Sequence, residues 1–456
     1  MNTKGIESVT FGANFKTVIM KKLLIGLTLL MAGISSTQAQ TKIKYVEYDL
    51  PNGLHVILHE DHSTPIVAVS VMYHVGSKNE DPSRTGFAHF FEHLMFEGSE
   101  NIPRGEYSNY VEKAGGALNA NTSQDRTFYY DLLPSNQLEL GLWLESERMM
   151  HAKVDSTGIA TQREVVKEEK RQRVDNQPYG SFQAEIMSHA FKVHPYQWTP
   201  IGSMADLDAA EESDYVNFYK KFYVPNNACL SIAGDLNIKA TKKLIAAYFS
   251  EIPKGAKIVR PTIVEPAKTK QVRDTIFDNI QLPAVMMAFH SPALGTDDAY
   301  AMDMVSNILS QGSSSRLHKR IVEDEQKAVF VGAFPFPLED PGIFIAFSIT
   351  NAGVDPLEVE NSIVDEVTKL QTELITEQEF QKLQNQIEND IVSGYSSQAG
   401  IAESLAQYYM YYGSTKLINT EIKKYRAVTR EDIMAVAKKY LMKENSVVLY
   451  YLPKEK

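Results

Sequence analysis

The chain has almost no cysteine and no excess of positive charge. Cys229 is the only cysteine among 456 residues, so no disulfide can form within the chain and the apolar core must stabilise the fold. The formal net charge is −11 at pH 7, which argues against nucleic acid as a partner because nucleic-acid-binding surfaces are basic. An apolar fraction of 43% and a charged fraction of 23% are ordinary for a globular protein.

Long hydrophobic runs are also missing, apart from one near the N-terminus. There Met20-Lys21-Lys22 precedes an apolar run from Leu23 to Ile34, followed by small and polar residues. This order is typical of a secretory signal peptide, and the run is shorter than the roughly 20 residues of a membrane span. We therefore expect residues 1–39 to be a signal peptide with an upstream extension, and the chain to be exported, periplasmic or secreted, without a membrane span. An organelle presequence would instead be Arg-rich and amphipathic.

The most informative stretch runs from Gly86 to Phe96 and has the pattern of a helix. At 3.6 residues per turn, His89 and His93 lie on one face with Glu92 beside them. Neutral imidazoles one turn apart can hold a zinc ion at about 2.0–2.1 Å, and a neighbouring carboxylate can accept a proton from a metal-bound water. This H-x-x-E-H order reverses the commoner H-E-x-x-H order. The alternative is a solvated polar face with two ordinary histidines. The opposite face of the helix is apolar and is expected to pack against the rest of the protein. It consists of Phe87, Phe90, Phe91 and Leu94.

A catalytic zinc site usually has a third protein ligand, and the acidic helix predicted around Thr161–Lys170 offers three candidates. We take 100° per residue and centre the apolar face of this helix between Val165 and Val166. Glu169 then lies about 10° from that centre. Glu168 and Glu164 lie about 110° and about 150° away, where we expect solvated surface charges. A carboxylate on a core-facing stripe needs a compensating charge, which zinc would supply. Glu169 is therefore the predicted third ligand, with an ordinary salt bridge as the alternative.

The pattern of the chain predicts two successive α+β halves. We expect a first domain at residues 40–252, a Pro- and Lys-bearing linker at 253–270, and a second domain at 271–456. In the first domain the predicted strands are 45–50, 54–58, 65–75, 117–121, 127–133 and 228–233, and the predicted helices include 107–113, 135–150, 157–175, 180–191 and 211–222. In the second, the predicted strands are 284–290, 328–334, 343–349 and 446–452, with helices near 297–309 and 314–325 and several more before Tyr440.

Matching segments indicate that the two halves are copies of one unit. Residues 214–228 and 432–446 share residue types at an offset of 432 − 214 = 218, and Tyr73-His74 matches Phe289-His290 at 289 − 73 = 216. Two similar offsets at distant places suggest a duplication. At the second offset, His89, Glu92 and His93 correspond to the apolar residues Val305, Ile308 and Leu309. The second half therefore has no equivalent metal-binding set.

Together these motifs resemble the pitrilysin/insulysin family of zinc metallopeptidases (inverzincins), and in particular its short-chain, processing-peptidase-like branch. The resemblance extends from Tyr45 to the C-terminus. It rests on the H-x-x-E-H helix, a glutamate 169 − 93 = 76 positions beyond His93, the sequence GGALNANTS at Gly115–Ser123, and VPNNA at Val224–Ala228. It implies two similar α+β halves, each a mostly antiparallel sheet packed with helices, that close like a clamshell over a peptide chamber.

The resemblance also implies an activity and its residues. The protein would be a zinc metalloendopeptidase in which His89, His93 and Glu169 bind one zinc ion per chain and Glu92 is the catalytic base. Gln162 stands where members of the family often have a second acidic residue; it lacks the charge but could still hydrogen-bond a ligand or water. An extended peptide substrate would add to an open strand edge formed by Ala117, Leu118, Asn119 and Ala120.

One departure from the family concerns the second half. Self-sufficient members carry an Arg and a Tyr, seven residues apart, after a Ser-Ser-Arg-Leu sequence. Here that sequence is present at Ser314–Leu317, but the two positions are Val322 and Val329. This resembles the zinc-bearing subunit of two-chain members, so we expect a heterodimer with a second family subunit that supplies the pair, unless Arg316 or Arg320 substitutes. The alternatives are a non-catalytic scaffold, like the respiratory-complex core proteins of this fold, and an exported zinc-binding chaperone.

Overall fold

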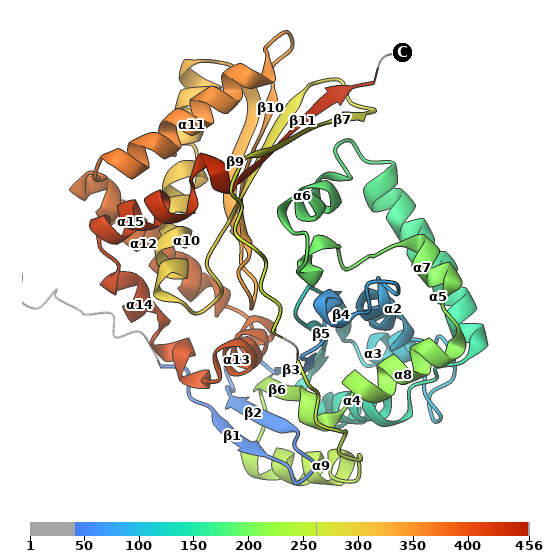
Figure 1. Cartoon of the computed structure of the whole chain (residues 1–456). Helices are drawn as coiled ribbons and strands as arrows, with labels where there is room; N and C mark the ends of the chain where they lie inside the picture. The colour runs from blue at the N-terminus through green and yellow to red at the C-terminus, as the bar shows by residue number, and fades with distance from the viewer. Residues whose placement is uncertain (1–41, 261, 455–456) are drawn as a thin grey trace, which may run out of the picture. The chain divides into compact units, whose positions relative to one another are not determined.

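A computed structural model describes residues 42–260 and 262–454 and contains two β-sheets with helices packed on them (Figure 1). From Lys44 onward the chain forms one compact unit. The predicted signal peptide lies outside the described residues and remains a prediction. None of the helices within the two described ranges combines the length and hydrophobicity that crossing a membrane requires.

The first sheet is six-stranded and mostly antiparallel, as predicted. Only β2 and β6 run parallel to each other, and β1 and β2 form the predicted hairpin. In spatial order the strands are β1 (Val46–Asp49), β2 (His55–Glu60), β6 (Ala228–Gly234), β3 (Ile66–Tyr73), β5 (Thr127–Pro134) and β4 (Ala117–Thr122). Strand β4 is therefore at the edge of this sheet.

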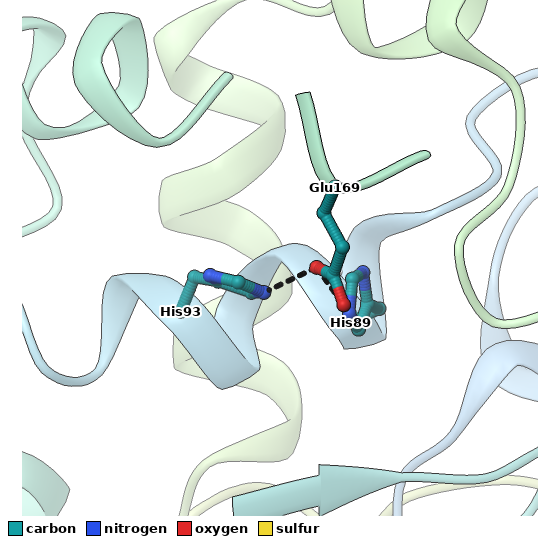
Figure 2. Close-up of side chains that lie close together, drawn as sticks. All are labelled: His89, His93 and Glu169. Carbon is teal, nitrogen blue, oxygen red and sulfur yellow. Dashed lines mark hydrogen bonds and ion pairs between the residues drawn. The ribbon is translucent and has the colours of Figure 1, made fainter. Parts of the chain in front are cut away.

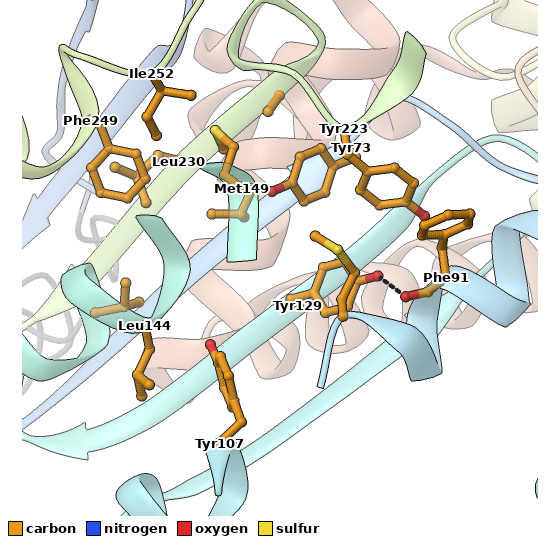
Figure 3. Close-up of a cluster of buried hydrophobic side chains, with 14 of the residues drawn as sticks. Tyr73, Phe91, Tyr107, Tyr129, Leu144, Met149, Tyr223, Leu230, Phe249 and Ile252 are labelled. Carbon is orange, nitrogen blue, oxygen red and sulfur yellow. Dashed lines mark hydrogen bonds between the residues drawn. The ribbon is translucent and has the colours of Figure 1, made fainter. Parts of the chain in front are cut away.

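The helices of the first half pack mainly around one apolar core. This core combines aliphatic side chains with aromatic rings, and Tyr129 Oη donates a hydrogen bond of 3.0 Å to the carbonyl oxygen of Phe91 (Figure 3). The helices are α2 (Phe87–Leu94), α3 (Tyr107–Lys113), α4 (Leu138–His151), α5 (Ser156–Lys170), α6 (Phe182–Ala190), α7 (Met204–Ala209), α8 (Glu212–Phe222) and α9 (Ile238–Phe249). A wider helical turn, η3 (Arg171–Asp175), continues α5, and the 3₁₀ turns are η1 (Ser77–Asn79), η2 (Ser135–Gln137), η4 (Pro195–Gln197) and η5 (Pro225–Asn227).

The second sheet is five-stranded and also mostly antiparallel, with one parallel pair, β7 and β11. Its strands in spatial order are β7 (Val272–Asp278), β11 (Ser446–Pro453), β8 (Ala284–His290), β10 (Ile343–Thr350) and β9 (Ala328–Phe336). The helical segments are α10 (Asp297–Ser310), η6 (His318–Asp324), α11 (Pro356–Thr372), α12 (Glu377–Gly394), α13 (Gln398–Tyr412), η7 (Thr415–Asn419), α14 (Glu421–Ala427), α15 (Arg430–Tyr440) and η8 (Lys443–Asn445). The described residues between α9 and β7 contain no helix or strand, but the predicted domain and linker boundaries remain predictions.

The two sheets repeat one arrangement. The order β2-β6-β3-β5-β4 in the first corresponds to β7-β11-β8-β10-β9 in the second, with the parallel pair at the same place. Asn227 Nδ2 donates to the carbonyl oxygens of the last residue of α8 and of His74, at 2.9 and 3.3 Å. Asn445 Nδ2 donates to the corresponding oxygens of Tyr440 and His290, at 2.7 and 3.1 Å. The two similar halves predicted from the sequence are thus present in the fold.

The halves also exchange one helix each. Helix α6 of the first half packs on β8 and β11 of the second sheet, and α13 of the second half packs on β3 and β6 of the first sheet (Figure 1). The two helices are equivalent in the repeat, because Phe182 shifted by 216 positions falls on Gln398, the first residue of α13. Apolar residues of α6 and of the second sheet accordingly form one shared core cluster. Each sheet therefore has one face covered by the other half.

Candidate metal centre

Helix α2 is fixed by its apolar face and by a carboxylate at its first turn. The predicted apolar residues are at most 2% exposed, and the Phe87 ring stacks on Tyr215 of α8 at 4.6 Å between centroids. Glu80 accepts hydrogen bonds from the backbone N–H groups of Gly86 (2.9 Å) and Ala88 (2.8 Å), which have no partner within the helix. Burial raises the pKa of Glu80 to about 8, although these hydrogen bonds act in the opposite direction. This contact defines where the helix begins.

The three predicted ligands lie together (Figure 2). Glu169, near the end of α5, places its Oε2 atom 3.3 Å from Nε2 of His89 and 3.1 Å from Nε2 of His93. The exposed fractions of the three side chains are only 12%, 23% and 15% in the order His89, His93, Glu169. Two imidazole nitrogens and one carboxylate oxygen thereby form a cluster between α2 and α5.

The donor set and its spacing fit a zinc ion. Donors at about 2.0–2.1 Å from a tetrahedral ion lie roughly 3.3 Å from one another, and the two measured nitrogen-to-oxygen distances agree with this separation. Within the part of the chain that the structure describes, His89, His93 and Glu169 are the only group of His, Cys, Asp or Glu side chains close enough to hold a metal ion. Hydrogen bonds from imidazole to carboxylate would have a similar length, so the geometry admits both a metal and a simple ion pair.

The exposures of the three glutamates of α5 agree with the helical-wheel prediction, but the predicted apolar face does not fully, because Val165 is 43% exposed and only Val166 of the two valines is buried. The side chains of Glu164 and Glu168 are 74% and 48% exposed, whereas that of Glu169 is 15% exposed. Hydrogen bonds from His89 and His93 hold the pKa of Glu169 below its usual value. Its second oxygen, Oε1, is paired with Arg173 at 2.7 Å.

Glu92, the predicted base, has a partner that was not predicted. Thr122 Oγ1 donates a hydrogen bond of 2.6 Å to Glu92 Oε2. Thr122 ends β4, and α2 packs on this strand. The residue lies in the GGALNANTS motif, so the motif marked the segment, but side-chain contact across 30 positions cannot be deduced from sequence spacing.

Gln162 hydrogen-bonds a residue that the sequence did not indicate. Its Nε2 atom donates to Glu97 Oε1 at 2.6 Å, and Glu97 in turn pairs with Arg104. Its Oε1 atom is buried, and no described residue hydrogen-bonds it. The structure therefore gives Gln162 no hydrogen bond to the three predicted ligands. The reason is that Glu97, just beyond α2, lies within reach of the Gln162 amide.

The predicted substrate strand is an edge strand. Among the described residues, strand β4 pairs only with β5, and the side chains along its length alternate, Ala117 and Asn119 being exposed while Leu118 and Ala120 are half-buried. Asn119 Oδ1 accepts a hydrogen bond of 2.9 Å from the backbone N–H of Ala120.

The arginines of the second half are already paired. Arg316 makes two hydrogen bonds, of 2.8 and 2.7 Å, with the carboxylate of Glu379. Arg320 pairs with Glu325 at 2.7 Å and with Asp365 at 2.8 Å. Both sets of contacts lie within the second half, and the ion pairs of these two arginines involve none of the three predicted ligands.

Comparison with known proteins gives consistent matches along the chain. Residues 55–202 match the family described as insulinase (peptidase family M16), and residues 213–387 match the peptidase M16 inactive domain. The chain is 30% identical over 442 residues to the zinc protease PqqE of Helicobacter pylori. The alignment covers 95% of this chain and 99% of that protein. An uncharacterized zinc protease of Rickettsia bellii is 24% identical, over 80% of this chain and 87% of that protein.

Solved structures show the same fold. The crystal structure of a protease from Helicobacter pylori matches with a TM-score of 0.86 and 28% identity, over 90% of this chain and all (100%) of the other. A peptidase M16 inactive domain from Pseudomonas fluorescens matches with a TM-score of 0.81 and 19% identity, over 90% of this chain and 98% of that one. The periplasmic protease PqqL of Escherichia coli matches with a TM-score of 0.75 and 19% identity, over 90% of this chain and 48% of that one. These last two likenesses concern the fold alone.

Proposed function

The chain belongs to the insulinase family of peptidases, M16, and on that basis we propose that it is a zinc-dependent endopeptidase or oligopeptidase acting on peptides or unfolded segments. The observation that carries the proposal is the convergence of His89, His93 and Glu169, from two separate helices, in one cluster. Glu92 is adjacent in sequence to His93 and shares its helix. The relatives named above as zinc proteases support the choice of metal.

Different residues of the site have different roles in the proposed reaction. His89, His93 and Glu169 would hold zinc, which, when bound, polarises a water molecule and lowers its pKa toward about 7. Glu92 accepts the proton of the attacking water at its carboxylate and later transfers it to the leaving amine. The exposed edge of β4 binds the substrate main chain by strand addition, which recognises the backbone more than the side chains.

A second subunit and an exported location are further parts of the proposal. The positions of the family's Arg and Tyr are Val322 and Val329, and Arg316 and Arg320 are engaged by carboxylates of their own half. A partner of the same family would therefore supply these groups. The basic and apolar N-terminal pattern supports export to the periplasm or beyond.

The proposal is tested by zinc content and hydrolysis of a quenched peptide, with the chain assayed alone and with a co-purified partner. Glu92→Gln should retain zinc and lose about 10²–10⁴-fold in kcat, because it removes the base and leaves the ligands. Glu169→Gln should lose zinc as well as activity. Glu164→Gln, on the solvent side of the same helix, should change neither property.

Other outcomes would favour the alternatives. A wild-type chain that binds zinc but cuts no peptide, alone or with its partner, would indicate a scaffold. Release of bound unfolded chains uncut would indicate a chaperone. Full activity of Glu92→Gln would contradict the assignment of the base.

A further inference from the structure

The tip of the β4–β5 hairpin is buried, which is unusual because loops normally lie on the surface. Gln124, Asp125 and Arg126 are only 1%, 2% and 9% exposed. The loop at Ser77-Lys78 covers part of this tip, since the backbone N–H of Lys78 donates to the Gln124 carbonyl oxygen at 2.9 Å. A buried tip that carries two opposite charges needs partners for both.

Two of these partners come from the second half of the chain. Asp125 Oδ2 accepts a hydrogen bond of 2.9 Å from the backbone N–H of Glu339, in the loop between β9 and β10. Arg126 Nη2 donates to Glu403 Oε1 of the exchanged helix α13 at 2.7 Å. The second half therefore contacts both charged residues of the tip, while Lys78 and Tyr196 of the first half also bind Asp125 Oδ1, at 2.8 and 2.6 Å.

The tip follows directly on the residue that contacts Glu92. Thr122 is the last residue of β4, and its hydroxyl donates the 2.6 Å hydrogen bond to Glu92 Oε2. Arg126 also hydrogen-bonds Asn121, the residue before Thr122. A hydrogen bond to one carboxylate oxygen fixes the orientation of the whole planar group, provided that the donor is itself fixed.

We propose that Thr122 is a positioning residue for Glu92, and that the second half, through Glu339 and Glu403, fixes Thr122. The inference rests on the proposed function, in which Glu92 transfers the proton. It gives the second half a part in the reaction without any contact to the metal ligands. Loss of the hydroxyl leaves Glu92 free to rotate, so that fewer bound substrates meet it in the productive orientation.

The first test compares Thr122→Val, which keeps the branched shape, with Thr122→Ser, which keeps the hydroxyl. Thr122→Val should lower kcat by about 10–100-fold, the effect expected from losing a hydrogen bond to a charged group, while KM and zinc content stay near wild type. Thr122→Ser should recover most of kcat. Thr368→Val is the control, because the Thr368 hydroxyl only donates to the Val364 carbonyl oxygen within α11.

The second test breaks the contact from α13. Glu403→Gln should speed hydrogen exchange of the backbone amides at residues 121–127 and lower kcat severalfold. In a Thr122→Val background it should lower kcat no further, because the effect passes through Thr122. Glu379→Gln, which breaks the equally close Arg316–Glu379 pair inside the second half, should leave both the exchange at 121–127 and kcat unchanged.

The possible results separate this inference from the proposed function. A wild-type chain that has no peptidase activity either alone or with its co-purified partner overturns both. An active wild type whose Thr122→Val variant keeps its kcat, or whose Thr122→Ser variant loses as much as Thr122→Val, overturns the role of Thr122. Unchanged exchange at residues 121–127 in Glu403→Gln, or additive losses in the double variant, overturns the role of the second half.

Discussion

Arg148 lies in the core of the first half with two carboxylates and is 1% exposed. Its guanidinium is 3.2 Å from Glu145 Oε2, hydrogen-bonds Tyr107 Oη, and lies 4.5 Å from the centre of the Tyr129 ring. Asp131, on β5, is fully buried beside it. One arginine cannot neutralise two buried carboxylates, so the folded state favours a proton on one of them. Burial raises the pKa of Glu145 to about 8 and that of Asp131 to about 6.

This cluster predicts a stability that depends on pH. A carboxyl group with a raised pKa binds more protons in the folded than in the unfolded state, so its effect on the free energy of unfolding becomes less favourable as pH rises from about 4.5 to about 8. Glu145→Gln removes this charge and leaves Arg148 balanced by Asp131. We expect the variant to exceed wild type in the free energy of unfolding at pH 8 by on the order of 1 kcal/mol, and the difference to shrink toward pH 5.

Urea unfolding at several pH values measures this difference. Glu139→Gln, at an exposed position of the same helix, is the control and should follow the wild-type profile. A constant difference between Glu145→Gln and wild type across the whole range would contradict the proton uptake.

The sequence predicted which residues of the site would be metal ligands, but not the hydrogen-bond partners of the residues around them. The proximity of His89 and His93 could be predicted because helical periodicity fixes which side chains share a face, whereas Glu169, on another helix, was predicted from its helical face together with the family resemblance. The surroundings of Glu92 and Gln162 could not be predicted, because their partners, Thr122 and Glu97, are selected by how α2 packs against β4 and α5. Such contacts depend on the tertiary structure, which spacing along the chain does not contain.

At the scale of elements, the β4–β5 hairpin needs a glycine beside its tip. A Cβ atom built on Gly76 would lie 2.4–2.5 Å from backbone atoms of Ser123, Gln124 and Asp125. These are backbone atoms, which cannot rotate away as a flexible side chain would. The loop that contains Gly76 can therefore lie this close to the hairpin tip only because residue 76 has no side chain.

Gly76→Ala should therefore displace the hairpin tip. We expect a loss of about 1–3 kcal/mol in the free energy of unfolding, the usual cost of inserting a methyl group into a well-packed site, together with a lower kcat. Thermal unfolding and peptide hydrolysis measure the two effects. Gly394→Ala is the control, because a Cβ atom there meets nothing within 4 Å; equal behaviour of the two variants would contradict the steric argument.

Most elements were predicted from the sequence, and those that were missed have recognisable causes. Strands β3, β8 and β11 are apolar runs whose short length and content of β-branched and aromatic residues favour a strand over a buried helix. Strand β7 was missed because it carries charged residues such as Arg273 and Asp274 and is mostly exposed. It is a strand because it pairs in parallel with β11, a partner more than 170 residues later in the chain. Helices α7 and α9 were also not predicted, although α9 has an amphipathic pattern that could have identified it.

At the scale of the whole molecule, the exchanged helices link the stability of the two halves. Helix α13 packs on the first sheet and α6 on the second, so unfolding either half exposes an apolar face of the other. We expect the full-length chain to unfold in one cooperative transition, whereas proteins with independent domains often show several. Calorimetry would reveal this, and two well-separated transitions would contradict it.

A variant in α13 would show the link directly. Leu405 is fully buried (0% exposed), and Leu405→Ala should lower the single transition temperature, because a buried Leu→Ala change costs about 2–5 kcal/mol. Leu357→Ala, at an exposed position of α11 (47%), is the control. If Leu405→Ala split the transition into two, the halves would be less dependent on each other than the packing indicates.

The exchange of α6 and α13 also bears on the ancestry of the chain. Two identical ancestral polypeptides that traded this segment would already have formed an obligate homodimer, with neither copy complete alone. Fusing their genes would then have changed the connectivity of the backbone and almost none of its contacts. One copy could afterwards lose its histidines without loss of the architecture, as the valine, isoleucine and leucine at the equivalent positions of α10 illustrate.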